Sequence, residues 1–278
     1  MNRCLIALLS ALVLLSACSN NKRTEPYQPS MAQAEKAAEA AADSLNATTD
    51  EEEMPTAADE LFDDFFFNYA SNLTQQRERT VFPLPVSDGG NTRTIQQKQW
   101  KLEPFFMKQD YYTLIFDSER QMELVRDTAV STVTVERIYL DKGRVEQFMF
   151  SRSSGRWMLH EVKWMPLPQN ANAQFLSFYQ QFATDSLFQR KSLAQQIQFS
   201  GPDPDDDFST IDGVITPDFW DAFRPELPHD MIYNIVYEQQ NPAAKEKLFL
   251  LRGIANGLEV EITFHQQKGQ WKLTKLST

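Results

Sequence analysis

Residues 62–77 read FDDFFFNYASNLTQQR, and residues 175–190 read FLSFYQQFATDSLFQR. In each segment the aromatic side chains fall at positions i, i+3, i+4 and i+7, which lie along one face of an α-helix. Each segment therefore predicts an amphipathic helix that packs on an apolar surface. Matching residues recur at one constant spacing: Phe62 with Phe175, Phe65 with Phe178, Phe66 with Tyr179, Tyr69 with Phe182, Ala70 with Ala183, and Gln76-Arg77 with Gln189-Arg190.

A second repeated block follows each helix. Its residues recur at a spacing only one residue longer, which keeps the two blocks in register. Repeats of this kind indicate duplicated structural units. The recurring residues are Gly143, Phe150, Gly155, Trp157 and Leu159 in the first copy, and Gly257, Phe264, Gly269, Trp271 and Leu273 in the second.

Each copy ends in three strand-like runs joined by glycine-containing turns. In residues 258–265 apolar and polar side chains alternate, which is typical of a strand with one buried face. Asn256-Gly257 is a strong signal for a β-hairpin turn. The predicted strands span roughly 129–140, 144–152 and 156–164 in the first copy, and 246–254, 258–266 and 270–277 in the second.

The same order of elements in both copies predicts two tandem domains, 61–165 and 166–278, each of a size typical of a folded unit. A helix followed by an antiparallel sheet, with aromatic residues on the facing sides, is an α+β arrangement. These residues resemble the nuclear-transport-factor-2-like (NTF2-like, or cystatin-like) fold, in which an N-terminal helix packs into a curved sheet. The chain also looks like a lipoprotein family of unknown function from Gram-negative gut bacteria. The resemblance implies the fold, but it implies no particular activity.

Residues 1–17 have the three parts of an export signal: a basic start at Arg3, an apolar run, and a small-residue site before Cys18. The apolar run from Leu5 to Leu15 is about half the ~20 residues that a membrane-spanning helix needs. Leu15-Ser16-Ala17-Cys18 resembles the lipobox of bacterial lipoproteins. That resemblance implies that Cys18 is lipidated. We therefore expect a protein anchored in the cell envelope, at the outer membrane, and facing either the periplasm or the cell surface.

Residues 18–60 are rich in Ala, Glu, Ser, Asn, Thr and Pro, and Tyr27 is their one aromatic residue. Such a composition buries too little apolar surface to offset the entropy of ordering, so we expect an acidic flexible tether. The sequence has two cysteines, Cys4 and Cys18. Because the first lies in the signal and the second is expected to carry lipid, no disulfide is predicted.

The chain has a formal net charge of −11 and no basic stripe. Nucleic-acid binding depends on clustered Lys and Arg residues that neutralise phosphates, so a nucleic-acid partner is not expected. The sequence also lacks the glycine-rich phosphate loops and the dinucleotide-binding pattern of common cofactor sites. We expect no cofactor.

No catalytic constellation stands out. His160 and His265 do not recur in the other copy, and His265 falls on the polar side of its strand. Two clusters hold residues suited to proton transfer: Asp110-Tyr111-Tyr112, and His229-Asp230 at the start of a strand predicted over 231–238. The second cluster is not expected to form a direct dyad, because neighbouring strand residues point to opposite faces. We therefore assign no catalytic residue.

The candidate ligand-binding residues are aromatic side chains between each helix and its sheet, and the alternative is that these side chains simply fill the core. A groove between the two copies is the other place expected for binding. In the first copy the aromatic candidates are Phe66, Tyr69, Trp100 and Phe106, and in the second they are Tyr179, Phe182, Trp220 and Phe223.

Two polar candidates accompany them. Arg77 and Arg190 could hold an anionic ligand in a bidentate manner, or could instead pair with a carboxylate and the last helix carbonyls. Asp203, Asp205 and Asp207 alternate as in the first positions of a calcium loop, but Phe208 and Val214 replace its glycine and glutamate. This loop is either a weak divalent-ion site or a solvated turn, and no spacing of His or Cys supports zinc.

From these features we expect a membrane-anchored binding module with an unidentified protein or small-molecule partner, and no enzymatic activity. The alternatives are an isomerase- or dehydratase-like enzyme that uses a pocket in one copy, and a structural envelope protein. An open pocket holding a polar side chain would favour the enzyme, whereas a closed aromatic interior would leave the surfaces and the groove between copies.

Overall fold

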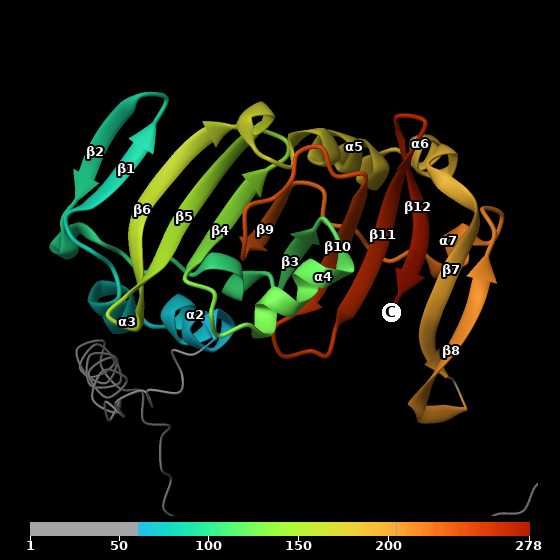
Figure 1. Ribbon diagram of the computed structural model, residues 1–278, viewed down its shortest axis with the longest axis horizontal. Helices are drawn as coiled ribbons and strands as arrows, with labels where there is room; N and C mark the ends of the chain where they lie inside the picture. Colours follow the sequence, from blue (N-terminus) through green and yellow to red (C-terminus); the bar gives the residue numbers. More distant parts are fainter. Residues whose placement is uncertain (1–60, 204) are drawn as a thin grey trace, which may run out of the picture. The chain divides into compact units, whose positions relative to one another are not determined.

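The computed structural model describes residues 61–203 and 205–278. Within these ranges no helix is both long and apolar enough to cross a membrane. Figure 1 shows the first repeat, residues 61–165, in blue to yellow-green. Its elements are α2 (Phe62–Ser71), α3 (Leu73–Glu78), β1 (Leu84–Asp88), β2 (Asn91–Ile95), η2 (Gln97–Gln99), η3 (Phe105–Lys108), β3 (Tyr111–Phe116), α4 (Glu119–Met122), η4 (Glu123–Arg126), β4 (Thr132–Tyr139), β5 (Arg144–Ser153) and β6 (Arg156–Pro166).

The second repeat, residues 166–278, follows the same order of elements. Its three last strands confirm the predicted strand-like runs to within one or two residues. Its elements are η5 (Leu167–Gln169), α5 (Ala173–Thr184), α6 (Ser186–Lys191), β7 (Leu193–Asp203), β8 (Asp206–Ile215), α7 (Trp220–Phe223), β9 (Met231–Val236), β10 (Glu246–Gly253), β11 (Glu259–Gln267) and β12 (Gln270–Ser277).

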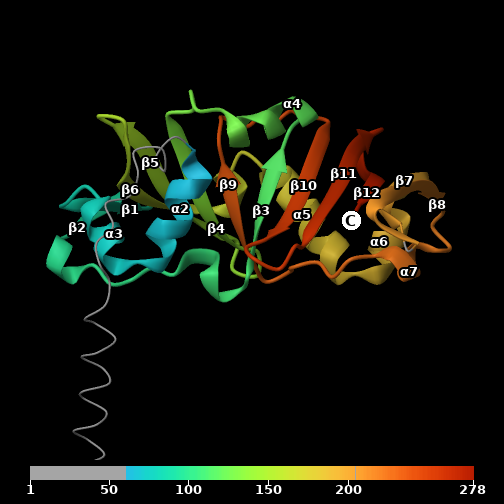
Figure 2. The ribbon, with the colours of Figure 1, turned by 90° about the horizontal axis from the view of Figure 1, so that it is seen from below.

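All strands of both repeats join in one curved sheet with few helices, a mixed α+β architecture (Figures 1 and 2). The 12 strands follow the order β2-β1-β6-β5-β4-β9-β3-β10-β11-β12-β7-β8. The two repeats therefore exchange a strand: β9 pairs antiparallel with β4 of the first repeat, and β3 pairs antiparallel with β10 of the second. Between them β3 and β9 run parallel, with Thr113 opposite Asn234. The boundary between the two repeats in the sequence, at residue 166, therefore does not correspond to a boundary in the sheet.

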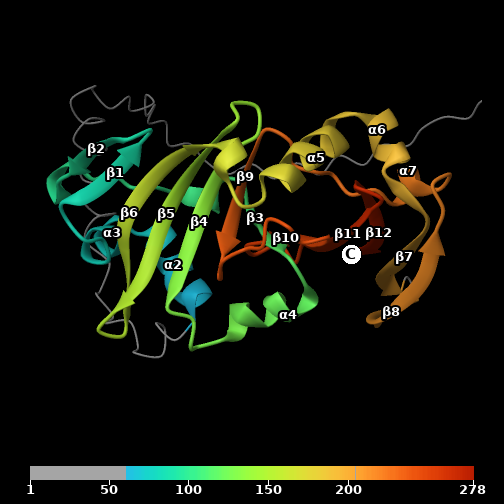
Figure 3. The same cartoon turned by 45° about the horizontal axis from the view of Figure 1, so that its top comes forward.

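The two predicted helices cover opposite faces of this sheet. Along β3, Leu114 belongs to the hydrophobic core that contains Phe62, Phe65 and Phe66 of α2, whereas Ile115 belongs to the core that contains Phe175 of α5. Neighbouring residues of a strand point to opposite faces, so α2 lies on one face and α5 on the other. Figure 3 shows α2 behind the sheet and α5 in front of it.

Each long helix is followed directly by a short helix, and the residue between them caps the N-terminus of the short helix with its side chain. The Asn72 side chain accepts hydrogen bonds from the backbone N–H groups of Thr74 and Gln75, at 2.8 and 3.1 Å. In the second repeat Asp185 does the same for Leu187 and Phe188. Asn and Asp are favoured at this position because they satisfy helix N–H groups that lack intrahelical acceptors. In each repeat, this turn between the long and the short helix directs the following glutamine, Gln76 or Gln189, towards the core.

A network of buried polar side chains crosses the junction of the repeats. The Lys247 ammonium group, on β10, forms an ion pair with Asp117 and donates a hydrogen bond to Asn172 Oδ1 at 2.6 Å. Gln240 accepts a bond from the Asn172 amide and donates to the Ile115 carbonyl. Lys247 is 2% exposed. The network therefore joins the end of β3, the start of α5 and the segment after β9 through a buried charge.

Candidate functional site

The aromatic candidates of the first repeat form a closed core rather than a pocket. Phe66, Tyr69 and Phe106 are fully buried, and Trp100 is buried as well. The Phe66 ring lies 4.9 Å from the ring of Phe105 and 5.6 Å from that of Phe150, measured between centroids. The Tyr69 hydroxyl, whose pKa is raised by burial, shares a 2.8 Å hydrogen bond with Thr80. Contacts this dense are those of a filled interior.

The second repeat differs at one of its four aromatic candidates. Tyr179, Phe182 and Trp220 are fully buried in the core under α5. Phe223, in contrast, is 42% exposed, and its ring packs against Phe199 at the surface. Its short helix, α7, ends at Phe223, so the side chain stays outside the core. Phe223 therefore does not line a helix–sheet pocket.

The recurring Gln-Arg pairs have a structural explanation. Gln76 Oε1 accepts hydrogen bonds from Trp100 Nε1 and from the backbone N–H of Glu103, and its amide donates to the Glu103 carbonyl. Gln189 Oε1 accepts from Trp220 Nε1 in the same manner, at 2.9 Å. Arg77 donates to the Trp100 carbonyl, and Arg190 pairs with Asp221. Each glutamine thus fixes a buried tryptophan, and neither arginine lies in a closed anion pocket.

The acidic loop and His265 also have partners within the fold, whereas the buried Nε2 of His160 has no hydrogen-bond partner in the described part of the chain. Asp203 accepts hydrogen bonds from the backbone N–H of Asp205 and from the Ser209 hydroxyl. The side chain of Asp207 lies outside the described residues. Across the side chains that the structure describes, no group of three His, Cys, Asp or Glu is arranged to hold a metal ion. His265 contacts Thr274 and Glu246, and His160 lies on β6 with its Nε2 buried.

A surface groove of about 500 Å³ lies where strands of the two repeats meet. It brings Tyr111 of the first cluster next to His229 and Asp230 of the second, because β3 and β9 run parallel and their first residues open at the same edge of the sheet. We call it the Tyr111 groove. Its lining consists of Tyr111, Glu226, Leu227, Pro228, His229, Asp230, Met231, Leu251 and Leu258.

Local sequence explains how these residues reach the groove. Asp110 has a left-handed backbone (φ 59°), and its carbonyl accepts a hydrogen bond from the Ile254 N–H, which fixes the start of β3 beside β10. The Pro228 carbonyl accepts a 2.8 Å hydrogen bond from the Tyr179 hydroxyl of α5. These two attachments hold Tyr111 and the segment before β9 on either side of one opening.

The groove combines an apolar base with an acidic rim. Leu227 is buried, Met231 is partly buried, and Leu258 is exposed. Burial raises the pKa of the Tyr111 hydroxyl, and the carboxylates of Glu226 and Asp230 raise it further. The hydroxyl therefore keeps its proton at neutral pH and is a hydrogen-bond donor. The carboxylates give the rim a negative potential that attracts a cation.

The groove lacks the features of a proton-transfer site. His229 Nε2 lies 3.6 Å from Asp230 Oδ1, but both side chains are largely exposed, at 56% and 84%. A general base is normally buried enough to tune its pKa and is directed at a bound substrate. Both side chains face the solvent instead. The chemistry that the groove offers is the binding of an apolar group next to a cationic one.

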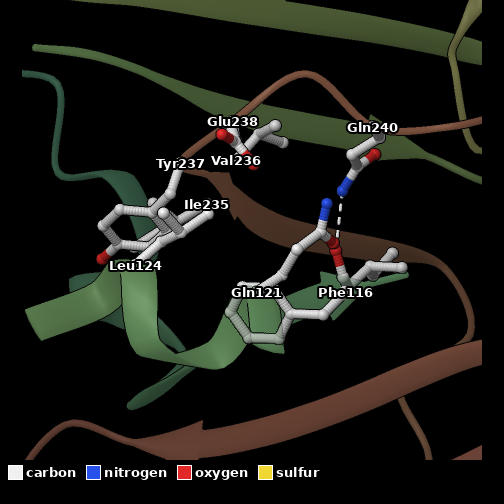
Figure 4. A pocket seen from close by; sticks show the side chains of 9 residues that line it. Phe116, Gln121, Leu124, Ile235, Val236, Tyr237, Glu238 and Gln240 are labelled. Atoms are coloured by element: carbon white, nitrogen blue, oxygen red, sulfur yellow. Dashed lines mark hydrogen bonds between the residues drawn. The ribbon is translucent and has the colours of Figure 1, made fainter. Parts of the chain in front are cut away.

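The opposite ends of β3 and β9 leave almost no space. A cavity of about 10 Å³ lies there between Phe116, Gln121, Leu124, Tyr237 and Gln240 (Figure 4). This volume is at the lower limit for a single water molecule. Gln240 crosses the space to donate a 2.6 Å hydrogen bond to the Ile115 carbonyl. Only the edge with Tyr111 therefore opens to a ligand along this strand pair.

A cluster of ionisable residues also lies on β4 and β5. Arg137 forms ion pairs with Glu103 and with Glu146, the latter at 3.0 Å, and its guanidinium lies over the rings of Phe148 and Tyr233. Burial raises the pKa of Glu146 to about 7, although Arg137 opposes the shift. These side chains neutralise one another's charges and are mostly buried, so we regard the cluster as structural.

The raised pKa of Glu146 predicts a pH-dependent stability. The carboxyl ionises near 4.5 when unfolded and near 7 when folded, so its contribution is full below pH 4.5 and is lost as the pH rises through 7. We expect Glu146→Gln to remove about 2 kcal/mol of the fall in unfolding free energy between pH 5 and pH 8. Urea denaturation at both values measures it. Glu119→Gln, at an exposed position, should keep the wild-type slope, and an equal slope in Glu146→Gln would contradict the prediction.

The family model described as a domain of unknown function (DUF4348) matches residues 41–278. The chain belongs to the DUF4348 family. A solved structure, titled as an NTF2-like protein from Bacteroides fragilis, is 43% identical, with a TM-score of 0.72, over 79% of this chain and 96% of that one. No curated protein matches the chain. The resemblance to an NTF2-like fold in a family of unknown function is confirmed.

For this DUF4348 protein, the sequence identified some groove residues and missed others. Asp110-Tyr111-Tyr112 and His229-Asp230 were recognised as polar clusters, but not as neighbours. Leu227 and Pro228 lie in an irregular segment without periodicity, so no pattern marked them. Leu251 and Leu258 belong to a hairpin, and its position beside the groove follows only from the strand order. β3 and β9 occupy equivalent positions in the two repeats. Their similarity was the one feature of the sequence that could have suggested that they lie side by side.

Proposed function

We propose that this DUF4348 protein is a non-enzymatic binding module, anchored in the outer membrane of the cell envelope through lipidated Cys18. Its binding site is the Tyr111 groove, and the ligand is a protein segment that presents an apolar side chain beside a Lys or Arg. Residues 1–60, which carry the anchor and the tether, lie outside the described residues. The observation that carries the proposal is the pairing of an apolar groove with an acidic rim.

The closed interiors support binding at the surface rather than catalysis within a helix–sheet pocket. NTF2-like folds include enzymes that need an open pocket with a polar side chain, whereas the space beside α2 is occupied by Phe66, Phe105, Phe106 and Phe150. The groove between the repeats, by contrast, has a volume in the range of ligand sites, which is about 300–1,000 Å³.

The charge pattern supports a basic partner segment. Glu226 and Asp230 are exposed at the rim and no Lys or Arg lines the groove. An apolar side chain would contact Leu227, Met231 and Leu251, and a neighbouring ammonium or guanidinium group would pair with the carboxylates. The protonated Tyr111 hydroxyl could donate to a backbone carbonyl of the segment.

The test is binding of a fluorescent peptide with alternating Leu and Lys by anisotropy, using the full chain. We expect Glu226→Lys/Asp230→Lys to weaken binding at least about tenfold, since each lost rim contact is worth roughly 1 kcal/mol and reversal adds repulsion. Glu123→Lys/Asp141→Lys changes the net charge equally at exposed positions elsewhere and should bind like the wild type. Equal loss in both double variants would show non-specific attraction to an acidic protein and would refute the proposal.

A further inference from the structure

A second groove, independent of the Tyr111 groove, lies in the second repeat between α5, α6 and the β11–β12 turn. Its volume is about 450 Å³. Three aromatic side chains line it: Phe178, Phe188 and Trp271. Around them stand amide and hydroxyl side chains together with Lys191 and Lys272, and no carboxylate is part of the lining. We call it the Trp271 groove.

The first repeat shows what the same location looks like when it is closed. Backbone hydrogen bonds establish the equivalence, because Leu159 N donates to Arg79 O and Leu273 N donates to Ser192 O, both at 2.8 Å. Ser192 therefore occupies the position of Arg79. In the terminal hairpins, Arg152 lies opposite Trp157 just as Gln266 lies opposite Trp271.

Two arginines cover the aromatic rings in the first repeat. The Arg79 guanidinium lies 5.6 Å from the centroid of the Phe65 ring, and that of Arg152 lies 4.8 Å from the Trp157 ring. Phe65 is fully buried. Ser192 is too short to cover Phe178, and Phe178 is only partly buried. Trp271 is 6% exposed, so its ring is covered nearly as well as that of Trp157. The ring that the second repeat leaves partly open is that of Phe178, where Ser192 replaces Arg79.

From this comparison we infer that the Trp271 groove binds an acidic oligosaccharide. The apolar C–H face of a sugar ring packs on flat aromatic side chains, which bury area at low entropic cost. Amide groups such as those of Gln174 and Gln181 both donate and accept, as sugar hydroxyls require. Lys191 and Lys272, whose ammonium group also donates to the Lys191 carbonyl, complement a carboxylate of the sugar and disfavour a cationic ligand.

The test uses trigalacturonic acid and its methyl ester as probes for the full chain, with isothermal titration calorimetry. We expect the acid to bind and the uncharged ester to bind at least about tenfold weaker, because the ester loses its ion pairs with the lysines. No binding of the acid at millimolar concentration would overturn the inference. Equal affinity for acid and ester would also overturn it, because the lysines would then play no part.

The decisive variant is Ser192→Arg/Gln266→Arg, which copies the closed arrangement of the first repeat. We expect it to lose at least about tenfold in affinity for the acid, although the two added positive charges would by themselves strengthen binding. Ser186→Arg/Gln196→Arg adds the same charge at exposed positions outside the groove and should bind at least as tightly as the wild type. Unchanged affinity in the first variant would overturn the inference. Glu226→Lys/Asp230→Lys, in the Tyr111 groove, should not affect this binding.

Discussion

Replacing Asp117 with asparagine is expected to lower the free energy of unfolding by about 3–5 kcal/mol, the largest effect predicted for this protein. Asp117 is the carboxylate partner of Lys247, whose side chain is 2% exposed. Without that carboxylate the ammonium group keeps its charge in a site that excludes water, and its acceptors are neutral amide oxygens, among them Asn172 Oδ1. Urea denaturation of the full chain, followed by circular dichroism, measures the change.

Two comparisons make this result specific. Asp88→Asn removes the carboxylate of the exposed Arg144–Asp88 pair and should cost less than about 1 kcal/mol. Asp117→Leu combined with Lys247→Met removes both charges and should cost less than Asp117→Asn alone, because no unpaired charge stays buried. A loss below about 1 kcal/mol for Asp117→Asn would mean that the lysine is hydrated or mobile, contrary to the network described above.

Gln76→Leu is expected to destabilise the protein by about 3 kcal/mol, because it removes the partner of one buried and two partly buried polar groups at once. These groups are the Trp100 indole N–H and both the N–H and the carbonyl of Glu103. Gln76 itself is fully buried, so water cannot simply replace its amide. The midpoint of urea unfolding, with its slope unchanged, provides the measurement.

The second repeat supplies the matched control. Gln189 accepts from Trp220 Nε1 and donates to the Phe182 carbonyl, but it has no counterpart of the Glu103 bonds. Gln189→Leu should therefore cost about 1–2 kcal/mol. Equal losses for Gln76→Leu and Gln189→Leu would show that the bonds to Glu103 contribute nothing, and would contradict the explanation.

Much of the fold could be predicted because local sequence determines it. Aromatic residues at helical spacing predicted α2 and α5, and alternating side chains next to Asn256-Gly257 predicted the β10–β11 hairpin. The exchange of β3 and β9 could not be predicted. Both strands have the same pattern of apolar residues and equivalent positions in the repeat. By sequence, either strand could therefore pair with the edge of β4 or of β10. Which partner each strand takes depends on long-range packing, and the hydrophobic periodicity of the sequence carries no information on it.

The candidate site divides in the same way. The aromatic residues considered as a pocket, such as Phe66 and Tyr179, are buried on the helices, but the sequence could not show whether the space between them was filled. Whether a core is closed depends on the sum of side-chain volumes and rotamers. Arg79 and Ser192 illustrate the point, since this difference between the repeats accompanies a covered Phe65 ring in one and a partly open Phe178 ring in the other.

The exchanged strands also order events during synthesis of the chain. As the ribosome releases the first repeat, the free edge of β4 has no native neighbour, because β9 ends at residue 236. The Thr113 hydroxyl donates to the carbonyl of Tyr233, which lies 120 residues later. Contacts so distant in sequence raise the contact order and slow folding. The N-terminal repeat must therefore wait, with an unpaired strand edge, until most of the second repeat has been made.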